Sequence, residues 1–175
     1  FDVLILNGSV FDGTMSEPKK IDIGIVKDQI VELGNLKARH SSRIIKAQGL
    51  AVAPGFIDLH AHLEPIFDLS DCESHLRQGV TTSLGGPDGR GPLPFGVYVD
   101  SLKKLGVGMN VGFLVGHNSV RRKVMKLDNR KPSVYELDQM KSLIAQAMNE
   151  GAFGISTGLK YLPGSFSQVE EVIEL

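Results

Sequence analysis

The chain has one cysteine, little excess of charge and no long hydrophobic run, and each shortage argues against a class of protein. Because Cys72 is alone, no internal disulfide framework exists, and we expect a reducing, cytoplasmic location. The 19 Lys and Arg against 20 Asp and Glu leave a net charge of -1. So balanced a charge argues against nucleic acid and anionic lipid as partners. No apolar run approaches the ~20 residues that span a bilayer, so we expect no membrane insertion.

Short apolar segments separated by turn dipeptides fill the first third of the chain, at residues 3–6, 21–26, 29–33 and 43–47. The dipeptides include Asn7-Gly8 and Asp12-Gly13, which are typical of tight turns between strands. We therefore predict an antiparallel β unit, as an open sheet or small sandwich, over residues 1–53.

From residue 54 onward the pattern changes to apolar strands separated by helical stretches, which is typical of βα units and a parallel sheet. Strands are predicted at residues 55–62, 80–85, 109–116 and 153–158. A complete (β/α)₈ barrel takes roughly 250 residues, so residues 54–175 accommodate about four of its units. The predicted fold is α/β: a small β-sandwich segment followed by the first half of a TIM-type barrel.

Two capping boxes predict helices in the last third of the chain. Ser133 and Glu136 open an amphipathic helix that runs to residue 150. Ser167 and Glu170 open a second helix, which the chain end cuts at Leu175. This cut helix, and a first residue that is not Met, indicate a trimmed or partial chain.

The sharpest chemical feature is a pair of histidines, His60 and His62, at the carboxyl end of a predicted strand. Side chains in a strand alternate with period two, so both imidazoles point to one face and can converge on one cation. Neutral imidazole suits Zn²⁺ and related divalent ions. Asp58 shares that face and is placed to orient the rings or to form a polar layer, while Ile57 and Leu59 point toward a covering helix.

Four motifs in order resemble the D-aminoacylase (N-acyl-D-amino-acid deacylase) branch of the amidohydrolase superfamily. They are residues 54–62 (PGFIDLHAH), 79–82 (GVTT), 116–121 (GHNSVR) and 151–164 (GAFGISTGLKYLPG). The resemblance implies a metal-dependent hydrolase on a (β/α)₈ barrel with one or two zinc ions. It also implies an enzyme more than twice this length, in which the rest of the polypeptide supplies two further metal-binding histidines and a catalytic aspartate, so that the fragment alone is inactive.

The chain departs from this branch after its second barrel strand. The resemblance implies a cysteine there, in an Asn-Cys-Gly setting, whereas this chain has Pro87-Asp88-Gly89. By alignment Asp88 is the substitute, a hard oxygen ligand, although Pro-Asp-Gly is also ordinary turn chemistry. We favour Lys160 as the metal bridge, because strand parity places it at the barrel mouth. The superfamily is known for a carboxylated lysine in this role; a solvated lysine is the alternative.

Three other residues lie where a substrate or outer-shell role is expected. His117 follows a buried strand and therefore reaches the carboxyl mouth, where it can bind substrate, neighbour the metal or be a hydrogen-bonded structural residue. Arg121 can clamp a carboxylate in two-pronged fashion, although the run it begins is equally typical of a solvated face. Tyr161 can donate a hydrogen bond to a substrate carbonyl or anchor its loop.

The sequence therefore predicts a zinc-dependent hydrolase of small C–N amides, most specifically of N-acyl-D-amino acids. Two alternatives stay open: an amidohydrolase of the dihydroorotase, hydantoinase or isoaspartyl-dipeptidase type, and a non-catalytic metal-binding fragment.

Overall fold

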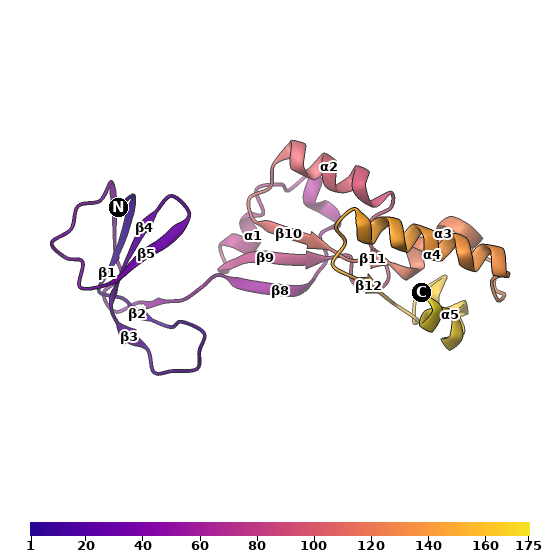
Figure 1. Cartoon of the computed structure of the whole chain (residues 1–175), viewed down its shortest axis with the longest axis horizontal. Coiled ribbons are helices and arrows are strands. Elements are labelled where there is room, and N and C mark those ends of the chain that lie inside the picture. The colour runs from indigo at the N-terminus through magenta and orange to yellow at the C-terminus, as the bar shows by residue number, and fades with distance from the viewer. The chain divides into compact units, whose positions relative to one another are not determined.

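The computed structural model describes all residues from Phe1 to Leu175. The chain divides into two compact units, Phe1–Pro54 and Gly55–Leu175 (Figure 1). No helix in the chain combines the length and the apolar character that crossing a membrane requires.

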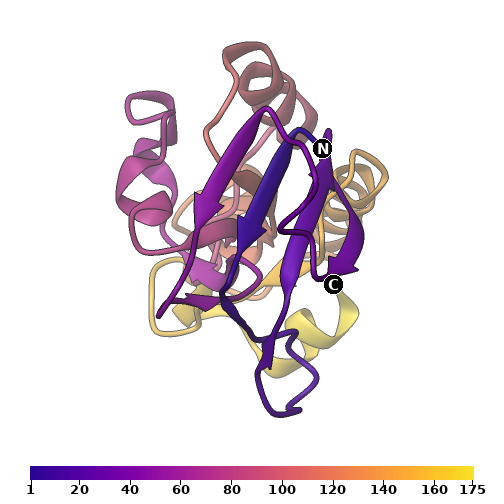
Figure 2. The same cartoon turned by 90° about the vertical axis from the view of Figure 1, so that its left-hand side faces the viewer.

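The first unit consists of short strands in two sheets, whose ribbons are seen side by side in Figure 2. The strands are β1 (Val3–Leu6), β2 (Ser9–Val10), β3 (Lys19–Lys20), β4 (Asp22–Val26), β5 (Gln29–Gly34), β6 (Arg43–Lys46) and β7 (Ala51–Val52). The order is β5-β4-β1-β6 in one sheet and β3-β2-β7 in the other. Asp22, the first residue of β4, is buried, and its carboxylate accepts the backbone N–H groups of Asn7 and Leu36 at 2.8 and 2.9 Å.

The prediction of a purely antiparallel unit is wrong in part. β1 pairs with β4, and β4 with β5, in antiparallel fashion, but β1–β6 and β2–β7 are parallel pairs. Turn dipeptides specify only hairpins between consecutive strands. Parallel pairs need long connections, and a long connection carries no signature of the strand beside which it returns.

The second unit is built on parallel strands. They are β8 (Phe56–Ala61), β9 (Val80–Gly85), β10 (Asn110–Phe113), β11 (Val115–Gly116) and β12 (Ile155–Ser156). β8, β9 and β10 form one sheet, β11 and β12 another, and every pair is parallel. The predicted strand at 109–116 divides at Leu114, and the predicted strand at 153–158 shrinks to two residues.

Helical segments separate these strands and complete the predicted α/β fold class. They are η1 (Glu64–Phe67), α1 (Glu73–Leu76), α2 (Phe95–Leu105), α3 (His117–Met125), α4 (Val134–Asn149), η2 (Gly164–Phe166) and α5 (Val169–Glu174). The apolar core of this unit joins strand residues Phe113 and Val115 to Val120 of α3 and Met140 of α4. The burial of these side chains fixes the strand ends on which the candidate site stands.

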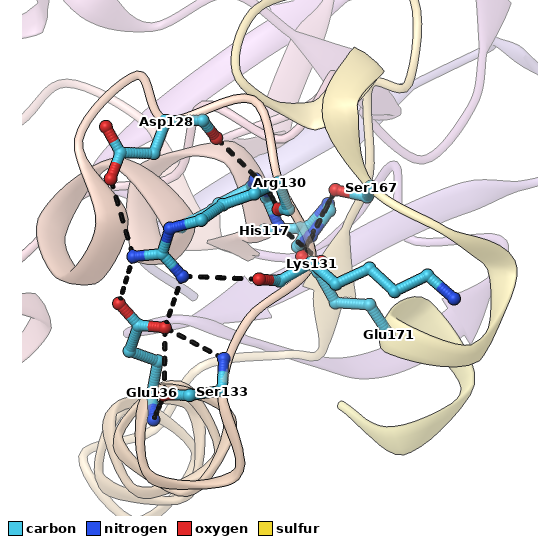
Figure 3. A network of polar contacts seen from close by, with 9 residues as sticks. His117, Asp128, Arg130, Lys131, Ser133, Glu136, Ser167 and Glu171 are labelled. Carbon is cyan, nitrogen blue, oxygen red and sulfur yellow. Dashed lines mark hydrogen bonds and ion pairs between the residues drawn. The ribbon is translucent and has the colours of Figure 1, made fainter.

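The first predicted capping box is confirmed. The Ser133 hydroxyl accepts the Glu136 N–H at 3.3 Å, and a Glu136 carboxylate oxygen accepts the Ser133 N–H at 2.8 Å. Arg130 donates two further hydrogen bonds to Glu136 (Figure 3). These bonds, those from Arg130 first, lower the pKa of Glu136 to about 2.

The second predicted box is wrong. α5 begins at Val169 after Gln168, and Ser167 makes no cap hydrogen bond. The Ser167 hydroxyl instead donates to the Glu171 carboxylate at 3.1 Å. A buried ionic group therefore outcompetes the local capping pattern for this hydroxyl.

The capping box provides a direct stability prediction. Ser133→Ala leaves the Glu136 N–H without its acceptor and is expected to lower the free energy of unfolding by about 1 kcal/mol. Ser142→Ala is the matched control, because that hydroxyl donates to the Asp138 carbonyl within α4 and caps nothing. Urea unfolding of both variants measures the difference, and equal losses would show that the cap contributes nothing specific.

Candidate metal centre

The carboxyl ends of β8 and β9 bring the two histidines to one edge of the parallel sheet. Ala61 and Gly85, the last residues of β8 and β9, pair with each other after a register shift between Asp58 and Ala61, so the two strands end together. His60 lies within β8 and His62 follows its last residue. Their ring centroids are 5.6 Å apart, which confirms that the two imidazoles lie close together at the strand end.

Asp88, from the loop after β9, completes a cluster with the two histidines. One of its carboxylate oxygens lies 3.7 Å from His60 Nε2 and 3.4 Å from His62 Nε2. The three ligand atoms all lie within 4.8 Å of one another. Two imidazole nitrogens and one carboxylate oxygen form a donor set that suits zinc and related divalent ions, so the residues fit such a metal.

The turn that carries Asp88 is also the ordinary turn that its sequence predicts. The Arg90 N–H donates to the Pro87 carbonyl at 3.0 Å, and Asp88 adopts a left-handed backbone with φ 56°. The turn and the cluster are thus one arrangement, because the turn directs the carboxylate toward the histidines.

The partner that orients His62 is Glu64, which the sequence analysis missed. His62 Nδ1 lies 3.3 Å from a Glu64 carboxylate oxygen. Partial burial raises the pKa of Glu64, but hydrogen bonds from its own backbone N–H and from His62 outweigh this and lower the pKa. An acidic residue two positions after a ligand histidine is the signal that could have identified it.

Asp58 does not have the expected role toward the rings. Its carboxylate accepts the backbone N–H of His60 at 3.0 Å and bonds neither imidazole. The reason is local, because an aspartate side chain readily accepts a hydrogen bond from the backbone N–H two residues later.

The strand-parity argument does not reach Lys160. β12 ends at Ser156, and Lys160 follows four residues later in an exposed turn, so the alternation of a strand does not extend to it. It forms no ion pair or side-chain hydrogen bond, whereas Asp88 lies against the histidines. Asp88 is therefore the residue that this structure brings together with the two histidines.

His117 and Arg121 are both fully buried, at 0% exposure, so neither side chain is open to a substrate in this chain. His117 Nε2 lies 2.9 Å from the Glu171 carboxylate, and Arg121 pairs with the other oxygen of the same group. Figure 3 shows His117 beside Glu171 and Ser167. Arg121 contacts Glu171 through Nη1 alone, and its Nη2 donates to the backbone carbonyls of Asp128 and Arg130, so the expected two-pronged clamp on a carboxylate does not form here.

Tyr161 and Cys72 remain outside the cluster. Tyr161 is 41% exposed and the Arg90 guanidinium lies 5.2 Å from its ring centre, so its substrate role stays a prediction. Cys72 is buried, and its thiol donates to the Ser70 carbonyl.

Comparison with known proteins gives two close relatives in Alcaligenes xylosoxydans xylosoxydans. Its D-aminoacylase is 32% identical over all of this chain and 41% of its own length. Its N-acyl-D-glutamate deacylase is 32% identical over 98% of this chain and 40% of its own length. No family model matches the chain.

Solved structures agree with these relatives. N-acyl-D-glutamate deacylase from Bordetella bronchiseptica, complexed with zinc and a phosphonate inhibitor, superimposes with a TM-score of 0.93 at 31% identity, over 99% of this chain and 42% of that one. A D-aminoacylase described as defining a novel subset of amidohydrolases gives 0.92 at 32% identity, over the same shares. Another D-aminoacylase structure concerns a binuclear metal centre.

With its parallel βα units and a histidine pair at the end of the first strand, the second unit is similar to a D-aminoacylase of the amidohydrolase superfamily. Within that superfamily the chain is homologous, along its whole length, to the D-aminoacylases and N-acyl-D-glutamate deacylases, which confirms the resemblance seen in its motifs. The chain spans about 40% of the length of the curated relatives it matches.

Proposed function

We propose that the chain is part of a zinc-dependent amidohydrolase that removes the acyl group from N-acyl-D-amino acids. The observation that carries the proposal is the convergence of His60, His62 and Asp88 at one sheet edge. Its support from relatives is the deacylase similarity along the whole chain. The three residues would hold the metal, and Lys160 is not needed to do so.

Zinc held by these three residues would supply Lewis acidity, which lowers the pKa of a bound water to about 7 and polarises an amide carbonyl. The residues of this chain would hold the metal and orient its ligands. His60 and His62 offer neutral nitrogens, and Asp88 adds one negative charge. Glu64 keeps a proton on His62 Nδ1, which leaves the Nε2 lone pair directed at Asp88 and the metal position.

The remaining barrel strands are the proposed partner of β8. β8 is an edge strand of its sheet, and its outward residues Ile57 and Leu59 are 64% and 69% exposed. The covering helix expected over them is not contributed by this chain. We propose that further strands and helices of the same barrel pair with and cover this edge. A cytoplasmic enzyme acting on a small amide remains part of the proposal.

Substrate preference tests the proposed activity. The whole enzyme is expected to release D-amino acids from N-acyl-D-amino acids and to leave the L-enantiomers and cyclic amides largely intact. Chiral chromatography of the products measures this. Hydrolysis confined to hydantoins or dihydroorotate would assign the chain to the cyclic-amide type of amidohydrolase instead.

The choice between Asp88 and Lys160 is tested by metal content. Asp88→Asn removes the charged oxygen of the cluster and is expected to weaken zinc binding by at least about 100-fold, the upper range for losing even an outer partner. Lys160→Ala is expected to bind zinc as the unmodified chain does, with or without bicarbonate. Titration with a chelating competitor measures both. Loss of zinc in Lys160→Ala alone, restored by short carboxylic acids, would establish the carbamate bridge.

A further inference from the structure

A single buried hydroxyl from β12 closes the turn that carries Asp88. Ser156 is 9% exposed, and its hydroxyl donates to the Gly86 carbonyl at 2.6 Å. The same oxygen accepts the Gly89 N–H at 3.0 Å. Ser156 therefore bonds the backbone on both sides of Asp88, across about seventy residues of sequence.

The loop after β12 packs against the same turn, the one that carries Asp88. A Cβ added at Gly158 would lie 2.1 Å from the Asp88 carbonyl oxygen, so only glycine allows this approach. Asn118 donates to the Gly158 carbonyl at 3.1 Å and holds that loop in place. The backbone of Asp88 is thus enclosed on one side by Gly158, and Ser156 anchors the turn at Gly86 before it and at Gly89 after it.

We propose that Ser156 is a positioning residue for the metal ligand Asp88. Asp88 has a left-handed φ of 56°, a conformation that is uncommon for non-glycine residues, although aspartate tolerates it better than most, and that surrounding contacts stabilise. The two hydrogen bonds of Ser156 are such contacts, and so direct the carboxylate toward His60 and His62. The inference rests on the proposed metal site, and it adds to that site a supporting residue from β12, the fourth barrel strand.

The test compares three substitutions of Ser156 in the purified chain. Ser156→Ala removes both hydrogen bonds, and Ser156→Cys fills nearly the same volume with a weak donor and acceptor. Both are expected to lower zinc affinity by about 10- to 100-fold, the range for losing an outer-shell partner. Ser156→Thr keeps the hydroxyl and is expected to restore most of the affinity.

Ser119→Ala is the matched control. The Ser119 N–H donates to the Gly89 carbonyl at 3.1 Å, so it touches the same turn, but its side chain makes no hydrogen bond. Zinc affinity in this variant is expected to match that of the unmodified chain. The visible spectrum of bound Co²⁺ supplies a second readout, since altered carboxylate ligation changes it while a general loss of stability does not.

The outcomes separate this inference from the proposed function. Unchanged zinc affinity and Co²⁺ spectrum in Ser156→Ala and Ser156→Cys, with zinc lost in Asp88→Asn, would overturn the role of Ser156 and leave the metal site standing. An equal loss in Ser119→Ala would also overturn it. Zinc binding that does not depend on Asp88 at all would overturn both proposals.

Discussion

Replacing His60 or His62 by alanine is expected to abolish turnover in the whole enzyme and to lower zinc affinity by more than about 100-fold. Each substitution leaves two of the three converging donors, fewer than the three protein ligands that hold catalytic zinc. Both side chains are exposed, so the fold does not depend on their packing. Metal analysis and a deacylation assay on the same preparations measure the two effects together.

His40→Ala is the control for this experiment. His40 is an exposed histidine of the first unit that lies outside the cluster, and its removal is expected to change neither metal content nor rate. Thermal unfolding of all three variants checks that the fold is retained. A His60→Ala or His62→Ala protein with normal metal content and near-normal kcat would eliminate the proposed metal site.

The largest effect on stability is expected at Glu171, the carboxylate shared by His117 and Arg121. Glu171→Ala leaves a guanidinium fully buried without its counter-charge, and breaking a buried ion pair in this way costs about 3–5 kcal/mol. His117 Nδ1 and Arg121 Nε are already buried without hydrogen-bond partners, so removing the Glu171 carboxylate leaves still more buried polar atoms unpaired. Denaturant unfolding measures the cost.

Glu174→Ala is the matched control, because Glu174 lies on the same short helix and pairs with Lys141 in an exposed position. Exposed pairs contribute little, so only a small change is expected. Similar losses at Glu171 and Glu174 would mean that the buried triad does not hold α5 to α3.

The same carboxylate makes stability depend on pH. Burial raises the pKa of Glu171, but hydrogen bonds and charge from His117 and Arg121 outweigh it, so the pKa in the folded chain lies below its ordinary value of 4.5. The stabilisation is complete above pH 4.5 and is lost as the pH falls through the lowered pKa. In Glu171→Gln this acid-dependent loss should be absent.

The sequence predicts best those features whose pattern spans only a few neighbouring residues. His60 and His62 are two residues apart on one strand, so period-two alternation was enough to bring them together. The capping box of Ser133 and Glu136 spans three residues and was equally readable. Such patterns are decided within a single element.

The errors arise where partners are distant in sequence or an element ends early. Glu171 lies more than fifty residues beyond His117, so nothing local distinguished a buried ion pair from a substrate contact. Strand parity does not carry over to Lys160, because β12 stops at Ser156 and a two-residue strand carries no alternation forward. Asp88 lies in a motif that predicts a turn with or without a metal, and only its distances to His60 and His62 in the folded chain make it a candidate ligand.

The most direct test of the metal site is an anomalous-diffraction map of zinc-loaded crystals, recorded on both sides of the zinc absorption edge. The account predicts an anomalous peak bonded to nitrogens of His60 and His62 and to a carboxylate oxygen of Asp88, with Lys160 unmodified. A peak bridged by a carboxylated Lys160, or a zinc ion without Asp88 among its ligands, would contradict it.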